Sequence, residues 1–116
     1  MAKGIVTFHL KRFWEYPDGR TVDLYEEIKA GRKTSEFRDW TDYWVDRLYR
    51  RTRDKNNPYI PILRPKVKRA WFVVGYPKGN LPRLEADIKN IVVHSDENGY
   101  AEQVEIQLEN VVEVTE

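Results

Sequence analysis

The sequence predicts an α+β fold, a small antiparallel or mixed β-barrel of about five or six strands with two or three helices. Short segments of alternating apolar and polar residues recur in the second half of the chain, separated by turn sequences. Two amphipathic segments with helix-capping residues lie in the first half. Closely spaced strands without helices between them favour a barrel over βαβ units. The chain has 116 residues, which predicts a single domain, 1–116.

The composition excludes several classes of protein and site. Hydrophobic residues make up 41% and charged residues 34%, which indicates a folded rather than a disordered chain. No apolar run approaches the roughly 20 residues of a membrane-spanning helix, so we expect no membrane partner. There is no cysteine and there are only two histidines, so we expect no metal and no cofactor. The cytoplasm is the expected compartment, and the sequence does not fix an oligomeric state.

The first segments predict a strand, a turn and a helix. Residues 4–10 alternate, with Val6, Phe8 and Leu10 on one face. A turn follows at residues 16–19, and the preceding Phe13 and Trp14 are expected in the core, with a place in a cleft wall as the alternative. The helix is expected to start at Thr21 as N-cap, to bury residues 24, 25 and 28, and to end at Gly31.

Residues 31–38 carry the pattern G-x-K-x-x-E-x-R where this helix gives way to a predicted strand near Ser35. Chance would produce it in about one chain of this length per thousand. In a strand Glu36 and Arg38 point the same way, and we expect Phe37 to point into the core. One interpretation is an Arg38–Glu36 ion pair that fixes the junction. The other places Lys33 and Arg38 as donors in a cleft, with Glu36 as acceptor or base.

These eight residues resemble the signature of the ASCH domain family, a branch of the PUA-like superfamily. The resemblance implies a PUA-like barrel with a cleft for nucleic acid or a modified nucleoside. It also implies that such a protein is either a binder or a hydrolase, namely a ribonuclease or an amidohydrolase of acylated cytidine. Lys33 falls on the lysine of the amidohydrolases, but Glu36 stands where they have a threonine, so the full motif fits a ribonuclease better. Lys33, Glu36 and Arg38 are then the catalytic candidates.

The middle of the chain departs from the pattern of that family. Residues 40–49 predict a helix, capped by Thr41, that would line or cover the cleft. Residues 53–68 contain three prolines and are expected to form an extended surface loop. Between Arg47 and Arg69 there are nine basic residues and one acidic residue, whereas all seven ionisable residues from position 95 onward are acidic. This asymmetry suits a polyanion bound in one orientation, although charged runs are usually solvated surface.

The last segments predict the rest of the sheet. Residues 70–76 are apolar on both faces and indicate a central strand, followed by a turn at residues 77–80. The alternation from Leu84 slips near Lys89, which predicts a β-bulge that places Ile91 and Val93 inside. A hairpin turn at residues 96–99 leads to a strand around Ile106, and residues 111–114 are expected to form a last short strand.

Two functions fit the sequence, and a third has less support. The preferred one is a module that binds single-stranded RNA or another single-stranded nucleic acid. Its expected contacts are the cleft, the phosphate-binding cations and the stacking aromatic residues, namely Lys33, Arg38, Trp40, Tyr59, Arg64, Lys66, Lys68 and Arg69. Alternatively, the apolar residues 60, 62 and 63 only pack the loop on the barrel. The second function is the hydrolase, and the third is a protein-interaction domain that uses the acidic C-terminal strands.

Overall fold

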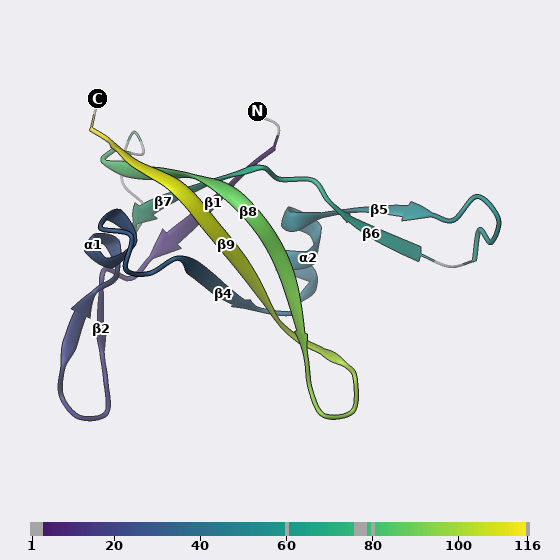
Figure 1. The fold of residues 1–116 in the computed structure, drawn as a ribbon, viewed down its shortest axis with the longest axis horizontal. Coiled ribbons are helices and arrows are strands. Elements are labelled where there is room, and N and C mark those ends of the chain that lie inside the picture. Colours follow the sequence, from purple (N-terminus) through teal and green to yellow (C-terminus); the bar gives the residue numbers. More distant parts are fainter. Residues whose placement is uncertain (1–3, 60, 76–78, 80, 116) are drawn as a thin grey trace.

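A curled five-stranded sheet forms the body of the molecule, and two separate two-stranded hairpins project from it (Figure 1). The computed structural model describes residues 4–59, 61–75, 79 and 81–115. The sheet has the order β1-β7-β8-β9-β4, with β1 parallel to β7 and the other neighbours antiparallel. Its strands are β1 (Ile5–Leu10), β7 (Arg69–Val74), β8 (Arg83–Ser95), β9 (Ala101–Val114) and β4 (Ser35–Asp39). The predicted α+β class with a curled, barrel-like sheet is confirmed.

The core fills the inner face of this sheet. Phe8 of β1 lies opposite Phe72 of β7, their ring centroids are 5.2 Å apart, and both side chains are fully buried. The expected inward residues of β1, Val6, Phe8 and Leu10, are all buried. The predicted central strand is β7, which lies between β1 and β8. Residue 76 and most of the predicted turn at 77–80 lie outside the described residues.

Helix α1 (Leu24–Lys29) packs on one end of the inner face through Tyr25 and Ile28. The expected N-cap was wrong, because Asp23 caps the helix by accepting a hydrogen bond from Glu26 N at 3.1 Å. Thr21 lies in a short strand instead, opposite Glu15, so the helix begins later than predicted. The helix does end as expected: Gly31 follows the C-cap with φ of +76°, a conformation that favours glycine.

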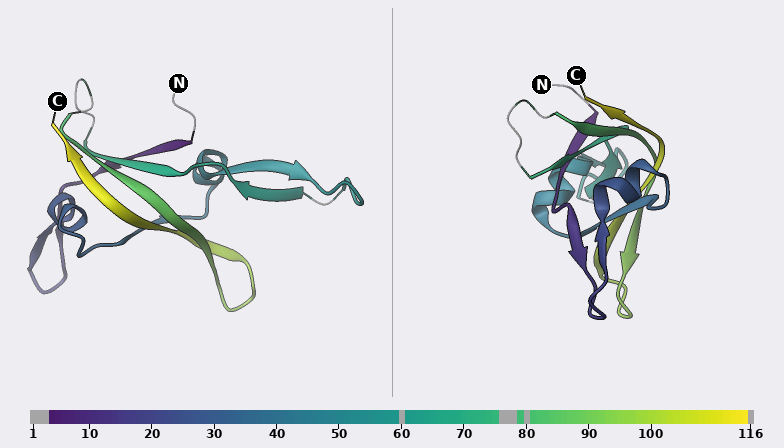
Figure 2. Two further views of the ribbon diagram at one scale, coloured as in Figure 1. Left: turned by 45° about the horizontal axis from the view of Figure 1, so that its top comes forward. Right: turned by 90° about the vertical axis from the view of Figure 1, so that its left-hand side faces the viewer.

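A small hairpin joins β1 to α1. It consists of β2 (Phe13–Glu15) and β3 (Thr21–Asp23), and the expected turn at residues 16–19 is closed by Gly19 N bonding Tyr16 O. The assignment of Phe13 and Trp14 to the core was wrong, since they are 55% and 51% exposed. These two strands form a sheet of their own outside the main sheet, as Figure 2 shows.

Helix α2 (Asp42–Leu48) lies over the inner face near β5. Thr41 is its N-cap, as predicted, and Val45 and Leu48 are buried. The ring of Trp44 stacks on Phe8 at 5.2 Å. This helix therefore covers the inside of the curled sheet. Neither described helix, six and seven residues long, could cross a membrane.

The prediction of an extended loop at residues 53–68 was wrong in large part, because these residues contain half of a β-hairpin. Strands β5 (Tyr49–Arg53) and β6 (Pro61–Pro65) pair antiparallel and project from the body; we call residues 49–65 the arm (Figures 1 and 2). Two of the prolines that favoured a loop are the first and last residues of β6, where a two-stranded ribbon tolerates them. The main sheet has five strands, in line with the predicted five or six, and the two hairpins raise the number of strands among the described residues to nine.

Strands β8 and β9 form a long hairpin whose turn, at residues 96–99, was predicted. The predicted bulge is present, because Ile88 faces Leu108 while Asn90 faces Gln107. Ile91 packs against the core, as expected, and Val93 faces Val104 but is 40% exposed. Residues 111–114 are not a separate strand, since β9 continues through them.

Candidate functional site

The turn between α1 and β4 carries the signature and is anchored to the helix. The backbone N–H groups of Arg32 and Lys33 both donate to Glu27 O at 3.0 Å. At the other end of the turn, Thr34 O accepts a hydrogen bond from Leu108 N of β9. The turn is therefore held by a helix on one side and by the sheet on the other, and we call residues 31–35 the signature turn.

Strand β4 turns Glu36 and Arg38 inward and Phe37 outward. Glu36 lies opposite Ile106 and Arg38 opposite Val104, and both of these partners are buried on the inner face. Phe37 is 43% exposed on the outer face, with its ring centroid 6.0 Å from that of His94. Glu36 and Arg38 do share a side, but the expectation that Phe37 enters the core was wrong. The prediction rested on the hydrophobicity of Phe37 alone, whereas the pairing of β4 with β9 decides which side chains of β4 point inward.

Lys33 and Glu36 come together, whereas Glu36 and Arg38 do not form the ion pair considered from the sequence. Lys33 Nζ lies 3.6 Å from Glu36 Oε2 and donates a hydrogen bond to Ser35 O. Glu36 is only 7% exposed, and its Oε2 accepts no hydrogen bond from any described residue. A buried carboxylate with spare acceptor capacity is costly unless something else uses it.

Arg38 is enclosed by aromatic rings. Its guanidinium carbon lies 5.1 Å from the centroid of Phe8 and 5.2 Å from that of Trp44. Its Nε is buried and finds no hydrogen-bond partner within the described chain. Contact with ring faces compensates a cation for part of its lost hydration. The signature therefore directs Glu36 and Arg38 to the inner side of β4 and places Lys33 beside Glu36.

A groove runs beside the signature turn on the side of the β2–β3 hairpin. Its volume is about 430 Å³, within the range of small-ligand sites. Two aromatic side chains, Tyr16 and Phe37, line it together with the cations Arg32 and Lys33. Arg32 also pairs with Glu27 at 2.8 Å. The other lining residues are Val22, Leu24, Glu27, Thr34 and Ser35.

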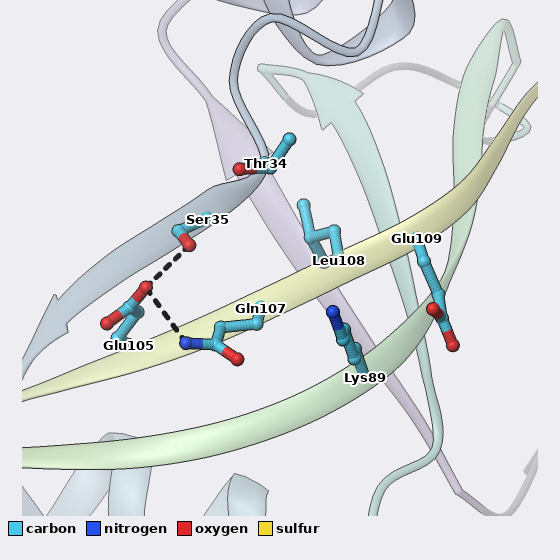
Figure 3. A pocket seen from close by; sticks show the side chains of 7 residues that line it. All are labelled: Thr34, Ser35, Lys89, Glu105, Gln107, Leu108 and Glu109. Atoms are coloured by element: carbon cyan, nitrogen blue, oxygen red, sulfur yellow. Dashed lines mark hydrogen bonds between the residues drawn. The ribbon is translucent and has the colours of Figure 1, made fainter.

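A second hollow lies on the other side of the same turn and has the opposite character (Figure 3). Its volume is about 420 Å³, and Glu105, Glu109 and Lys89 line it. Ser35 Oγ donates a hydrogen bond to Glu105 Oε2 at 2.6 Å, and His94 Nε2 lies 2.8 Å from Glu105 Oε1 in a second hydrogen bond. These two bonds keep the pKa of Glu105 below its usual value. The carboxylate stays charged at neutral pH, so this hollow repels phosphate.

The hydrogen bonds of Ser35 also bear on its chemistry. Glu105 lies between Ser35 and His94, so the serine hydroxyl donates to a carboxylate and has no bond to the imidazole. A serine nucleophile needs the histidine in the middle of such a triad. Within the described parts of the chain, no three histidine, cysteine, aspartate or glutamate side chains gather as metal ligands.

The remaining candidates lie away from the signature turn. Trp40, at the far end of β4, is partly buried with its ring 5.7 Å from that of Tyr49. Tyr59 is 90% exposed in the turn of the arm. Arg69 is engaged with Glu85 and Asp87 at 3.6 and 3.3 Å. The others are exposed, on β6 or just after it: Arg64, Lys66 and Lys68. The predicted residues thus divide between the signature turn and the arm.

Sequence reasoning missed the hairpin side of the groove. Tyr16 and Val22 belong to a hairpin whose turn was predicted, but nothing in the local pattern places that hairpin against β4. No family model matches this sequence, and comparisons with curated proteins and with solved structures found no match. The ASCH resemblance therefore stays a prediction that rests on the signature residues alone.

Proposed function

We propose that this protein binds single-stranded nucleic acid, with RNA preferred, in the groove beside the signature turn. The observation that carries the proposal is the combination of Tyr16 and Phe37 with Arg32 and Lys33 around one groove. Single strands are bound by aromatic rings that stack on bases and by cations that neutralise phosphates. The neighbouring hollow has two glutamates, one lysine and no aromatic ring among its lining residues, so it lacks this combination.

Each side of the groove has a distinct role in this proposal. Phe37 is 43% exposed and Tyr16 is 41% exposed, so both rings have a free face for a base. Arg32 is 63% exposed in spite of its ion pair, so it can turn toward a phosphate. Lys33 is held by Ser35 O and Glu36, and it supplies a fixed positive charge at the inner end. Glu27 can accept a hydrogen bond from an amino group of a base.

The proposed ligands include a free or modified nucleoside, which would use the stacking rings without the phosphate contacts. Lys66, Lys68 and Tyr59 remain proposed secondary contacts because they are exposed. Trp40, Arg38 and Arg69 are engaged inside the protein and contribute less. The absence of cysteine among the 116 residues is the basis for keeping the cytoplasm as the proposed compartment.

Fluorescence anisotropy with a labelled single-stranded RNA tests the proposal. Phe37→Ala should weaken binding by about 1–3 kcal/mol through lost stacking. Lys33→Ala should weaken it and flatten its salt dependence, because a phosphate contact is lost. The matched control is Lys89→Ala, a lysine beside the same turn on the acidic side, which should bind as the unaltered protein does. Equal loss in Lys89→Ala, or no binding at all, would contradict the groove.

A hydrolase of RNA or of an acylated nucleoside is the second candidate, and one observation favours it. Glu36 is buried beside Lys33 with an unbonded oxygen, an arrangement that suits a general base next to a charge-stabilising cation. Glu36→Gln keeps the shape of the side chain and should abolish turnover while single-strand binding stays. Long incubation of RNA and of acylated cytidine that yields no product would remove this candidate.

A further inference from the structure

The arm carries a charge arrangement that its own fold does not explain. In the register of β5 and β6, Arg50 lies directly opposite Arg64. Side chains opposite each other in an antiparallel pair are about 5 Å apart at Cβ, and like charges there are destabilising. Neither arginine forms an ion pair with a described residue, and both are exposed. The hairpin thus keeps a repulsive pair where almost any neutral residue would be more stable.

The neighbouring Arg51 shows the contrast. It points to the opposite face of β5 and is neutralised by Asp46 of α2, with Nη2 2.8 Å from Oδ1. The two faces of one ribbon therefore differ in their partners. One arginine is neutralised by the body, and the other two are left for a polyanion.

The face that holds Arg50 and Arg64 has a shape of its own. Thr52 and Ile62 lie next along the same face, opposite each other in the register. A hollow of about 510 Å³ is lined by these two residues, by Arg64 and by residues 53–56. The one acid there, Asp54, accepts a hydrogen bond from Asn56 N in the turn. The surface is cationic, narrow and projects from the body.

We propose that this face of the arm binds double-stranded DNA as a two-stranded β-ribbon. The major groove of B-form DNA is about 12 Å wide and admits a two-stranded ribbon, whose strands are about 5 Å apart. Arg50 and Arg64 neutralise phosphates and reach base edges, and Thr52 and Ile62 offer the methyl groups that contact thymine. This is a second activity, separate from the groove beside the signature turn.

Two features favour a duplex over a single strand on this surface. Single strands need aromatic rings on which bases stack, and the face with Arg50, Thr52, Ile62 and Arg64 contains none. Of the two aromatic residues of the arm, Tyr59 lies in its turn and Tyr49 is buried where the arm leaves the body. The second feature is protrusion: the arm extends along the longest axis of the molecule, away from α1 and the β2–β3 hairpin (Figure 1). A projecting ribbon can enter a groove, which a flat patch cannot.

The same geometry predicts selection against duplex RNA. The major groove of A-form RNA is deep and narrow, so a ribbon cannot enter it. We therefore expect a 20-base-pair DNA duplex to bind at least about tenfold more tightly than the RNA duplex of the same sequence, since only the former admits the ribbon.

Anisotropy with the labelled DNA duplex, over a series of salt concentrations, tests the inference on the full chain. Arg50→Thr with Arg64→Thr should weaken binding about tenfold or more and lower the slope of log affinity against log salt by about two. Arg51→Thr is the control, because it removes one arginine charge from the neutralised face, and it should leave the slope unchanged. Circular dichroism confirms that each variant is folded.

Every other outcome overturns the inference. Equal loss in Arg51→Thr would indicate net charge rather than the ribbon face, and equal binding of the RNA duplex would exclude groove entry. Self-association that is lost in the double variant, without duplex binding, would assign the arm to the acidic strands of a second copy. Phe37→Ala separates this inference from the proposed function, because it should reduce single-stranded RNA binding and leave duplex DNA binding unchanged.

Discussion

The signature turn and the arm hold their charges in opposite ways. At the signature turn Lys33 lies 3.6 Å from Glu36, and Arg32 pairs with Glu27 at 2.8 Å. In the arm Arg50 faces Arg64, with no ion pair to any described residue. The pair of Lys33 and Glu36 is largely removed from solvent, and a charge held in this way suits a defined ligand geometry. Charges that are left unpaired suit a polyanion that supplies the partner.

The two regions also differ in how much they contribute to the core. The body buries fully the rings of Phe8 and Phe72 and the side chains of Leu84 and Ile106. Of the described arm residues, Tyr49 alone is buried, at the point where the arm leaves the body. A two-stranded ribbon without a covered face is marginally stable alone. The arm must therefore depend on the body for its position.

The largest expected effect is the loss of stability on a substitution in the core of the body. Phe72→Ala should lower the free energy of unfolding by about 3–5 kcal/mol, because it empties a site between Phe8 and the rest of the core. Leu63→Ala in the arm, where the side chain is 36% exposed, should change it by less than about 0.5 kcal/mol. Urea denaturation followed by tryptophan fluorescence measures both. A comparable loss in Leu63→Ala would show that the arm is part of the folding unit.

Much of this body was predictable from the sequence, and the reasons are local. The alternation of β1 and the bulge near Lys89 are period-two patterns that any one-sided strand must show. The inward and outward faces of β4 were not predictable, because an apolar Phe37 between the charged Glu36 and Arg38 indicates that Phe37 points inward. The true orientation comes from β9, which is remote in sequence. The arm was missed for a related reason, since its prolines indicate a loop unless they stand at the ends of a strand.

The candidate site was predicted only in part. The signature located Lys33 and Glu36, which the structure does bring together. The aromatic residues of the groove come from different elements, Tyr16 from a hairpin turn and Phe37 from β4, so their proximity depends on tertiary packing. Charge counting found the basic segment, but only the strand register shows that Arg50 faces Arg64.

The next largest effect concerns the ion pair between Lys33 and Glu36. Lys33→Met should lower the free energy of unfolding by about 1–3 kcal/mol, because it leaves the buried Glu36 carboxylate without its cation. Adding Glu36→Gln should restore part of that loss, so that the two changes are not additive. Arg64→Met in the arm serves as the control and should stay within about 0.5 kcal/mol. Additive losses would show that the two side chains do not interact.

Acid should destabilise the body and leave the charges of the arginines in the arm unchanged. The hydrogen bond from Tyr25 and then that from Lys29 hold the pKa of Glu113 below its usual value, as Ser35 and His94 do for Glu105. A pKa lowered by folding adds stability above the unfolded value, about 4.3, and this stability is lost as pH falls through the folded value. Unfolding free energy should therefore fall from about pH 5 downward, because these two carboxylates become protonated.

Glu113→Gln should make this fall shallower, since one of the titrating groups is removed. Glu97→Gln is the control, because that side chain lies in the hairpin turn and forms no hydrogen bond with the described residues. Urea midpoints between pH 3 and 7 give the profiles. An unchanged profile in Glu113→Gln would mean that the bond to Tyr25 does not contribute to stability. Arginine stays charged throughout this range, so the arginines of the arm contribute no slope.

The smallest effect is also the most specific to the arm. Arg64→Thr removes the repulsion across the ribbon. The free energy of unfolding should therefore stay equal or rise, by about 0.2–1 kcal/mol at most. The gain should be largest at low salt and should vanish near 1 M, where the Debye length is about 3 Å. Arg51→Thr should show no gain, since it removes an exposed ion pair with Asp46. A stabilising Arg64→Thr that also loses duplex binding would show that the arm keeps its repulsive pair for a ligand and not for its fold.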